Sequence, residues 1–405
     1  MCFQSFLKWR DIETKLVEEE FDVCVVGGGV MGSCAAYSLA EAGKSTVLIE
    51  QFPIPHTRGS SSGHSRITSL SDYRHPFMAS LVNHGYKQWL KLQTIAAEWA
   101  VRQAPVLTIG TDEEVIKHKG KRIESCGFPP TRLTIADLNA QYKSQFPSDR
   151  FAVIDPSGLV LVANKCVLLV QKLFKSRGGV ILDGCPVKQV ETEKERIRIT
   201  CPRRVITCKS LVLCPGPWAK ELLGKVGIKL PLRTLKTGVW YFKLRDPSFP
   251  PSSINDLSIS NEFFYATRPF EYPGLIKFGV HDGVEIDPGE REKCDLSHLK
   301  KKMTDYLEEF FPQIEPQPSI EESCMYTMTP DSNFILDYHP KHKNIVYACG
   351  FSGTGFQLGP AIGEVLAGMV LDYEPIHDMT PFRASRFNLQ DEEDPPKSPS
   401  ATSKY

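Results

Sequence analysis

Three glycines and one glutamate near the start of the chain have the spacing of a dinucleotide-binding site. Gly27, Gly29 and Gly32 form the pattern G-x-G-x-x-G, and Glu50 follows Gly32 by 18 positions. In such a site the first glycine permits a tight turn, the second lets the backbone approach a pyrophosphate, and the third allows close helix packing. Unpaired N–H groups at the helix start bind the anion. We expect Glu50 to accept hydrogen bonds from a ribose diol; a glycine-rich turn without a ligand is the structural alternative.

Two further glycine-containing loops follow predicted strands. Pro215-Gly216-Pro217-Trp218 comes after an apolar run at 211–214, and a loop from Gly350 to Gly355 comes after one at 344–349. The first motif does not distinguish NAD from FAD, but glycine loops more than 300 positions apart that converge on one ligand indicate a long one, such as FAD. The Pro-, Gly- and Ser-rich segment 51–68 is a third loop, whose His64 and Arg66 are either site residues or solvated.

The elements that position these residues fall into two kinds. Strands at 23–26 and 47–49 flank a helix around 35–40, which makes a βαβ unit. Alternating runs at 238–242, 263–268 and 274–281 favour an antiparallel sheet in a second lobe. Further predicted helices lie within 77–100, around 167–173 and at 295–311 and 358–369, and further strands at 180–182, 197–199, 205–206, 211–214 and 344–349. The sequence therefore predicts an α/β fold: a Rossmann-like lobe into which a mostly antiparallel lobe is inserted.

Composition narrows the class of partner. The 405 residues include 48 basic and 48 acidic side chains, so the chain lacks the cationic character of a nucleic-acid or membrane-surface binder. No apolar run is long enough to cross a bilayer, and charges interrupt the first 21 residues where a signal peptide would be apolar. Twelve scattered cysteines without a C-x-x-C pair read as free thiols of a reducing compartment. We expect an intracellular protein with a small-molecule partner.

Six segments resemble one enzyme family. They are FDVCVVGGGVMGSCAAYSLAEAGKSTVLIEQF, PHTRGSSSGHSRI, SLVLCPGPW, EYPGLIKFG, ESCMYTMTPDSNFILDYHP and IVYACGFSGTGFQLGPAIGEVL. In this order they are similar to the monomeric sarcosine oxidase and peroxisomal pipecolate oxidase family over residues 21–389. The resemblance implies an FAD-binding lobe of the glutathione-reductase type formed by 21–105, 155–225 and 323–389, and a substrate lobe formed by 106–154 and 226–322. The segment 390–405 has almost no apolar content, which predicts a disordered tail.

The resemblance also implies roles for individual residues. Cys324, in the C-M-Y-T segment, matches the cysteine that holds FAD covalently, although it is also readable as one more buried thiol. Lys277 matches the lysine that lies over the flavin and speeds its reaction with dioxygen; an outward strand lysine is the alternative. Tyr265 and Tyr326 match aromatic residues of the substrate cavity or are ordinary core. The full cofactor-binding set is expected to be Gly27, Gly29, Gly32, Glu50, Arg58, Ser61, His64, Val187, Gly216, Trp218, Cys324, Gly353, Gly355, Phe356 and Gln357.

Departures from the family pattern bear on the substrate. Ser69 and Gln357 stand where the family has an arginine and a lysine that clamp the substrate carboxylate, and Thr354 stands where a histidine is common. An unpaired buried carboxylate is costly, so either another cation substitutes or the substrate differs. Arg268 is our candidate for that substitute. The catalytic set is expected to be Arg66, Tyr265, Arg268, Lys277 and Tyr326, with no metal.

The resemblance implies an FAD-dependent oxidase of a secondary amine or of an N-alkyl or cyclic amino acid, which passes a hydride to flavin N5 and returns the electrons to dioxygen as hydrogen peroxide. The alternatives are a flavin-dependent amine dehydrogenase with another acceptor, an NAD-dependent dehydrogenase, and a catalytically impaired amine-binding flavoprotein. Such an enzyme is expected to be a monomer in the peroxisome, with the cytoplasm as the alternative. The last residues, Ser403-Lys404-Tyr405, match two of the three positions of the SKL address read by the peroxisomal import receptor.

Overall fold

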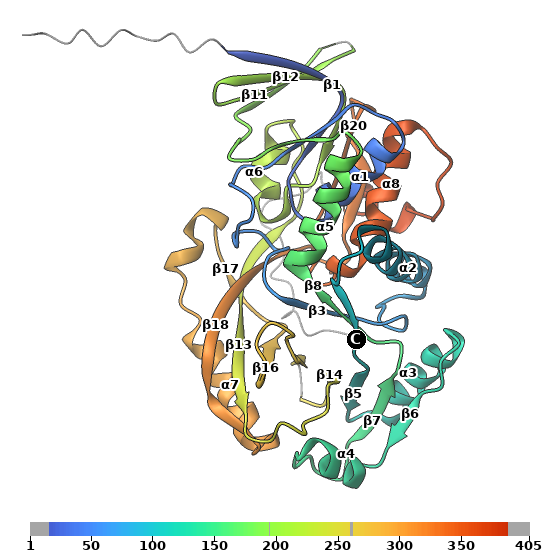
Figure 1. Ribbon diagram of the computed structural model, residues 1–405, viewed down its shortest axis with the longest axis vertical. Coiled ribbons are helices and arrows are strands. Elements are labelled where there is room, and N and C mark those ends of the chain that lie inside the picture. Colours follow the sequence, from blue (N-terminus) through green and yellow to red (C-terminus); the bar gives the residue numbers. More distant parts are fainter. Residues whose placement is uncertain (1–15, 194, 260–261, 388–405) are drawn as a thin grey trace, which may run out of the picture.

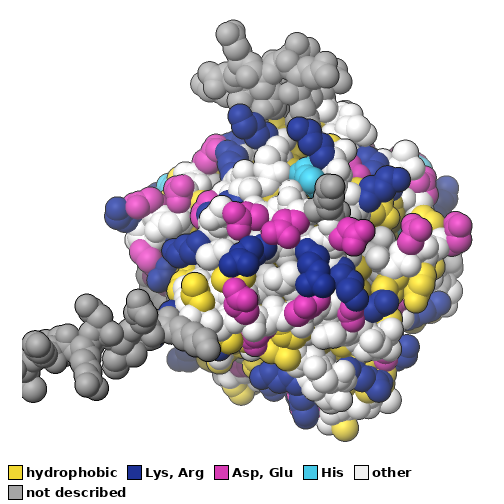
Figure 2. Space-filling model, turned by 90° about the horizontal axis from the view of Figure 1, so that it is seen from above, with side chains coloured by type: hydrophobic (Ala, Val, Ile, Leu, Met, Phe, Trp, Pro, Cys, Tyr) yellow, Lys and Arg dark blue, Asp and Glu magenta, His cyan; other side chains and the backbone are white. Residues whose placement is uncertain are grey.

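A computed structural model describes residues 16–193, 195–259 and 262–387. The expected disordered tail at 390–405 and the Ser403-Lys404-Tyr405 end lie outside these residues. Figure 1 shows two lobes, one containing β1, β12 and α1 and the other containing β13, β18 and α7. Basic and acidic side chains are intermixed on the face seen in Figure 2, as the zero formal charge leads one to expect.

The first lobe is built on an eight-stranded sheet. The strands run in the order β10 (Gln189–Thr192), β11 (Ile197–Cys201), β12 (Arg204–Leu213), β1 (Val17–Val26), β2 (Thr46–Ile49) and β9 (Val180–Leu182), with β20 (Ile345–Cys349) beside β12 and β19 (Ile335–Tyr338) beside β20. The strands β20, β12, β1, β2 and β9 are parallel to their neighbours in this series. The strands predicted at 205–206 and 211–214 are one continuous strand, β12.

Both faces of this sheet are covered, which explains its uninterrupted apolar strands. Val23 and Val25 of β1 belong to a core that includes α1 (Val30–Glu41), α2 (Ala79–Ala96), α5 (Ala163–Ser176) and α8 (Gly359–Leu371). Cys24 and Val26 point the other way, into a core shared with α6 (Ala219–Gly224). A three-stranded sheet of β3 (Ser65–Thr68), β8 (Leu159–Val162) and β4 (Val101–Gln103) lies at the lobe's edge.

The second lobe is built on a nine-stranded sheet. The strands run in the order β17 (Val284–Glu285), β13 (Arg233–Leu244), β16 (Leu275–Val280), β15 (Phe264–Thr267), β14 (Ser253–Asp256), β5 (Val106–Gly110), β7 (Phe151–Asp155) and β6 (Thr131–Leu133), and β18 (Ile314–Met328) also pairs with β13. All pairs are antiparallel except β14 with β5. The helices of this lobe are α3 (Glu113–Ser125), α4 (Ile135–Tyr142) and α7 (Ser297–Phe310).

Alternation along these strands separates a core face from a second face. Trp240, Phe264 and Phe278 pack with α7 in the core of this lobe. Residues one position away, including Tyr265 and Lys277, point to the opposite face. The lobe boundaries expected from the sequence remain a proposal, and one of them needs adjustment: the division between 322 and 323 falls inside β18, whose whole length pairs with β13.

None of the helices within the described ranges is long and apolar enough to cross a membrane. In the same ranges, no group of three or more His, Cys, Asp and Glu side chains is arranged to hold a metal ion.

Candidate active site

A cavity of about 1000 Å³ lies between the two large sheets. In the first lobe it is lined by the residues that directly follow the parallel strands: Gly27 after β1, Glu50 after β2, Cys214 after β12 and Gly350 after β20. The carboxyl ends of parallel strands are where α/β sheets bind ligands. In the second lobe the cavity is lined by the face of the mixed sheet that α7 does not cover.

The glycine turn between β1 and α1 has no room for side chains. Gly27 has φ of +109°, and a Cβ there would lie 2.1 Å from the carbonyl oxygen of Cys214. A Cβ on Gly32 would lie 1.9 Å from the carbonyl oxygen of Gly27, so the turn packs against the first turn of α1. The amide of Val30 at the start of α1 donates to Ser61 Oγ at 3.0 Å. This turn and helix start match the backbone shape that a pyrophosphate requires.

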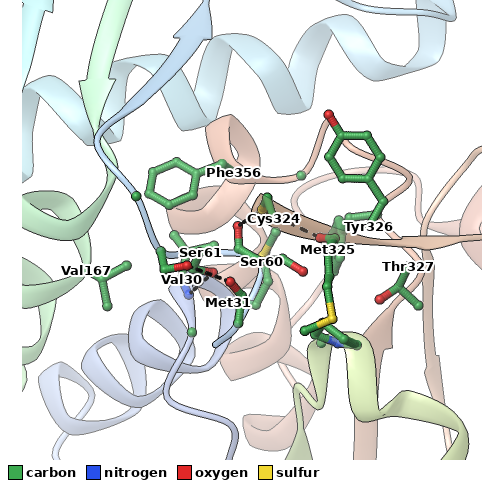
Figure 3. Close-up of a pocket in the computed structure, with 18 of the residues that line it drawn as sticks. Val30, Met31, Ser60, Ser61, Val167, Cys324, Met325, Tyr326, Thr327 and Phe356 are labelled. Atoms are coloured by element: carbon green, nitrogen blue, oxygen red, sulfur yellow. Dashed lines mark hydrogen bonds between the residues drawn. The ribbon is translucent and has the colours of Figure 1, made fainter. Parts of the chain in front are cut away.

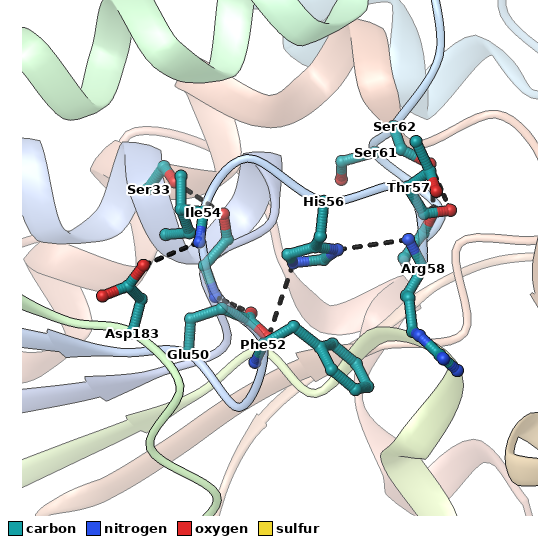
Figure 4. Close-up of polar contacts among 12 residues, drawn as sticks. Ser33, Glu50, Phe52, Ile54, His56, Thr57, Arg58, Ser61, Ser62 and Asp183 are labelled. Carbon is teal, nitrogen blue, oxygen red and sulfur yellow. Dashed lines mark hydrogen bonds and ion pairs between the residues drawn. The ribbon is translucent and has the colours of Figure 1, made fainter.

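Glu50 lies at the cavity wall and supports the glycine turn. One carboxylate oxygen accepts from the amide of Gly28 at 2.7 Å, and the other accepts from the amide of Phe52 at 3.0 Å, as Figure 4 shows for the second contact. His56 lies 3.5 Å from the same carboxylate. These bonds hold Glu50 at the end of β2, where we expected it; its contact with a ribose remains a proposal.

The loop after Glu50 separates the predicted residues into two groups. Ser61, His64 and Arg66 line the cavity. Arg58 does not: its side chain is exposed, with the guanidinium carbon 5.3 Å from the centre of the Phe52 ring. Arg58 is therefore not among the residues that line the cavity, and its role in cofactor binding stays a prediction.

The later glycine loops converge on the same cavity. Its lining includes the predicted residues Val187, Gly216, Trp218, Gly353, Gly355, Phe356 and Gln357. The backbone carbonyl of Gln357 accepts from Trp89 Nε1 at 3.1 Å, and the side chain of Gln357 bonds to Thr68 Oγ1 at 2.5 Å and to the carbonyl of Asp72 at 3.2 Å. These contacts join the last glycine loop to α2 and β3, so segments about 270–290 positions apart in the sequence contribute to one site.

Cys324 lies on β18 with its thiol at the cavity wall. Its Sγ is 3.5 Å from the carbonyl oxygen of Ser60 and 3.8 Å from Arg66 Nη2, and Figure 3 shows it beside Ser60 and Ser61. Glu322 and Tyr326, two positions away on either side, also line the cavity. Cys324 is a half-buried free thiol, whereas Cys166 and most of the other described cysteines are fully buried.

Lys277 is a buried lysine of the mixed sheet that lines the cavity. It is 4 % exposed, and its Nζ donates to the carbonyl of Ser65 at 2.9 Å. Burial, with a smaller contribution from the Arg66 guanidinium, lowers the pKa of Lys277 to about 7. Arg66 itself donates to the carbonyls of Ser60 and Ser62 and so fixes the loop beside Cys324.

Aromatic and neutral groups surround Lys277. Tyr265 and Tyr326 both line the cavity, and burial raises the pKa of the Tyr326 hydroxyl well above its usual value. The ring of His281 lies 5.2 Å from that of Tyr326, and burial lowers the pKa of His281 to about 4. At neutral pH this wall therefore presents the uncharged hydroxyl of Tyr326 and the uncharged imidazole of His281.

Arg268 does not reach the cavity. Arg268 comes directly after β15 and three positions after Tyr265, an odd spacing that puts the two side chains on opposite faces of the sheet. Its Nη1 donates to the carbonyl of Phe249 at 2.7 Å. Phe249 belongs to the core on the opposite face of the sheet. The prediction that Arg268 replaces a missing carboxylate-binding cation is therefore wrong, because strand alternation turns it away from the site.

Sequence reasoning missed several lining residues. Asn255, Phe263, Thr267, His281 and Glu322 all border the cavity. Thr267 lies two positions from Tyr265 and directly opposite Lys277, and Asn255 lies opposite Tyr265. Once Tyr265 and Lys277 are assigned to the site, the two-residue period of paired strands identifies Asn255 and Thr267. Glu322 lies two positions before Cys324 on β18, so the same period identifies it.

The comparisons with known proteins agree with this geometry. Residues 22–369 match the family model described as FAD dependent oxidoreductase. The peroxisomal sarcosine oxidase of Mus musculus is 35 % identical over 386 residues, covering 91 % of this chain and 96 % of the relative. The monomeric sarcosine oxidase of Bacillus sp. (strain NS-129) is 28 % identical, covering 92 % and 98 %.

Among solved structures, NikD, described as an unusual amino acid oxidase essential for nikkomycin biosynthesis, superimposes with a TM-score of 0.81 at 18 % identity, covering 90 % of this chain and 98 % of NikD. This likeness confirms the two-lobed α/β fold. The cavity volume, the glycine turn without room for side chains and the convergence of the first and last glycine loops fit an extended flavin dinucleotide. On the family match and the 35 % identity, this chain belongs to the FAD-dependent oxidoreductase family.

Proposed function

We propose that this FAD-dependent oxidoreductase oxidises the C–N bond of a secondary amine or of an N-alkyl or cyclic amino acid, with dioxygen as the electron acceptor. The observation that carries the proposal is the wall of Lys277, Tyr265 and Tyr326, which faces the same cavity as the glycine turn. The relatives named sarcosine oxidase support the substrate class. Bound FAD supplies the redox chemistry by accepting a hydride equivalent from the carbon next to the amine nitrogen.

The residues around the substrate would favour an unprotonated amine. The low pKa of His281 and the high pKa of Tyr326 keep both side chains neutral, and the aromatic rings of Phe263 and Tyr265 exclude water from this wall. A protonated amine has no lone pair to assist hydride loss, so an environment that disfavours charge helps the reaction. These side chains bind and orient the amine and take no part in the electron transfer.

Lys277 would act on dioxygen. Its charged form is able to stabilise the negative charge that develops on oxygen during reoxidation. The Ser65 carbonyl holds the amine in one place, so little reorganisation is needed when that charge forms. A pKa of about 7 means that both protonation states are populated near neutral pH.

Cys324 would hold the flavin covalently, as expected from the resemblance. Its position at the cavity wall beside Arg66 supports this assignment. The test is denaturing electrophoresis with fluorescence detection: flavin fluorescence should stay with the protein band of the wild type and be lost from Cys324→Ala. Cys126→Ala, a half-buried cysteine that does not line the cavity, is the matched control. Fluorescence that persists in Cys324→Ala contradicts the assignment.

One experiment separates the oxidase from its alternatives. Purified yellow protein is mixed anaerobically with sarcosine, pipecolate, proline, other N-methyl amino acids and uncharged amines, and the loss of flavin absorbance is followed before air is admitted. Bleaching, then rapid recovery with hydrogen peroxide formation, is expected. Slow recovery in air with fast dye reduction identifies an amine dehydrogenase, and colour without bleaching identifies an impaired amine-binding flavoprotein.

We also propose a monomer located in the peroxisome and carried there by the import receptor, with the cytoplasm as the alternative location. The relatives named peroxisomal sarcosine oxidase support this location. A fluorescent protein fused to the N-terminus should co-localise with a peroxisomal marker and become diffuse when the last three residues are removed. Sedimentation at micromolar concentration tests the monomer.

A further inference from the structure

The mixed sheet supplies the wall of the cavity against which a substrate would lie. β1, α1 and the glycine turn between them belong to the other lobe, so these elements would hold the pyrophosphate of a bound cofactor away from this wall (Figure 1). The described residues that this sheet turns toward the cavity include Asn255, Phe263, Tyr265, Thr267, Lys277, His281, Glu322 and Tyr326. The charges in this set decide which substrates the wall accepts.

The two arginines at this part of the cavity are already engaged with backbone carbonyls. Arg66 Nη1 donates to Ser65 at 2.9 Å, and its Nη2 donates to Ser60 at 3.0 Å and Ser62 at 2.6 Å. Arg291 is 8 % exposed, and it donates to the carbonyls of Thr57 and Arg58 and to Ser323. Both guanidinium groups therefore hold the 57–65 loop, and neither is presented to a ligand over the sheet.

The remaining basic groups of this wall, His281 and Lys277, offer little positive charge with which a ligand carboxylate could pair. His281 is neutral at pH 7 because burial lowers its pKa to about 4. Lys277 donates to Ser65, and the proposed function assigns it to dioxygen. The carboxylate of Glu322, which accepts from Tyr241 Oη at 2.9 Å, adds a negative charge to the same cavity.

Gln357, Ser69 and Ser71 near the last glycine loop are neutral side chains, and the charged group that they contact is the carboxylate of Asp155. Gln357 bonds to Thr68 and to the carbonyl of Asp72, as described above. Ser69 Oγ lies 3.4 Å from Ser71 Oγ, and Ser71 Oγ donates to Asp155. The nearby cation, Lys119, donates to the carbonyl of Ser71 at 3.0 Å and does not line the cavity, so this group gives an incoming carboxylate no cation to pair with.

A carboxylate that leaves water for such a wall loses its hydration without gaining an ion pair, which is strongly unfavourable. We propose that the substrate of this chain is an N-alkyl or cyclic amine whose non-reacting end carries no carboxylate. This rests on the proposed function and narrows it. The aromatic rings of Tyr265, Tyr326 and Phe263 suit an uncharged substituent at that end.

The test compares matched substrates on the purified holoenzyme. Pipecolate, pipecolamide and 2-methylpiperidine share one ring and differ in the group that replaces the carboxylate. The rate of anaerobic flavin bleaching divided by the dissociation constant is measured for each, at equal concentrations of unprotonated amine. We expect this ratio to be at least tenfold higher for both uncharged compounds. An equal or higher ratio for pipecolate overturns the inference while leaving the proposed function intact.

If no amine bleaches the flavin, the proposed function fails. Binding measurements then still test the inference about charge. Benzoate and benzamide are then titrated while the flavin spectrum is followed. Tighter binding of benzamide supports the inference, and equal or tighter binding of benzoate overturns it.

A variant with an added cation gives the converse prediction. Gln357→Lys places an amine at the cavity wall, and it should raise the ratio for pipecolate relative to pipecolamide at least tenfold. Gln189→Lys adds the same charge on the exposed edge strand β10 and should leave that relative ratio unchanged. Thermal melting tests whether both variants fold. If Gln357→Lys does not fold, Thr354→Lys, in the same glycine loop, takes its place. A folded cavity variant whose preference does not move contradicts the charge argument.

Discussion

Replacing Lys277 with methionine tests how strongly burial opposes the charge on this amine. The pKa of Lys277 falls from the ordinary value of 10.5 to about 7 in the folded chain. Between these two values the unfolded state holds nearly one proton more than the folded state, so this group makes the free energy of unfolding rise with pH. Integrated from pH 7 to pH 9, the rise is about 2.3 kcal/mol.

The variant removes this dependence without leaving a buried carbonyl unpaired. Met has a similar length, and the Ser65 carbonyl that Lys277 contacts also accepts from Arg66 Nη1 at 2.9 Å. Lys277→Met should therefore be more stable than the wild type at pH 7. That advantage should shrink by about 2.3 kcal/mol by pH 9, as the wild-type lysine becomes neutral in the folded state.

The assay measures the free energy of unfolding of the wild type and of Lys277→Met by denaturant at pH 7, 8 and 9. The difference between the two proteins is compared across pH, because the contributions of groups that titrate equally in both proteins cancel in it. Lys243→Met is the matched control: Lys243 lies on neighbouring β13, with 61 % of its side chain exposed, and its replacement should change stability equally at all three pH values. A difference between wild type and Lys277→Met that is constant from pH 7 to pH 9 refutes the reasoning.

Three further predictions concern the same site. The rate at which air reoxidises the reduced flavin should fall as pH rises through about 7 in the wild type and be lower and independent of pH in Lys277→Met; stopped-flow absorbance measures it, and an unchanged profile in the variant contradicts the role of this amine. Gly27→Ala forces a Cβ to 2.1 Å from the Cys214 carbonyl oxygen at φ of +109°, so it should cost about 1–3 kcal/mol of stability and lower the ratio of flavin to protein absorbance. Ser61→Ala removes the acceptor for the Val30 amide and should cost about 1 kcal/mol in denaturant unfolding; an unchanged midpoint would count against a capping role.

The glycine turn could be predicted from the sequence because its requirements are local. Gly27 adopts a φ of +109°, and a side chain on Gly32 would meet the Gly27 carbonyl oxygen within the same turn, and these local constraints leave a recognisable spacing. Lys277 and Tyr265 could be placed on strands because their neighbours alternate. Their relation to the flavin came only from resemblance to a family.

The errors arose where position depends on distant partners. The strand β18 is rich in proline and glutamate near its start, and it forms because β13 lies beside it, which no local pattern reveals. Arg268 was chosen by its distance along the chain from Tyr265 without regard to the face of the strand. The sequence also could not show whether Arg58 lines the cavity, because it lies in an irregular loop, where neither a helical nor a strand period indicates the direction of a side chain.

The interleaving of the two lobes has a consequence for how the enzyme matures. β1 is made among the first residues, but β20, which completes the parallel sheet beside β12, and the Gly353 loop emerge from the ribosome only after about 345 residues have been synthesised. A nascent chain therefore exposes the edge of β12 that β20 later covers until most of the chain has been made, and unpaired strand edges of this kind are prone to aggregation. Insertion of the vitamin-derived group is accordingly a late event in biogenesis, because earlier the polypeptide cannot enclose it.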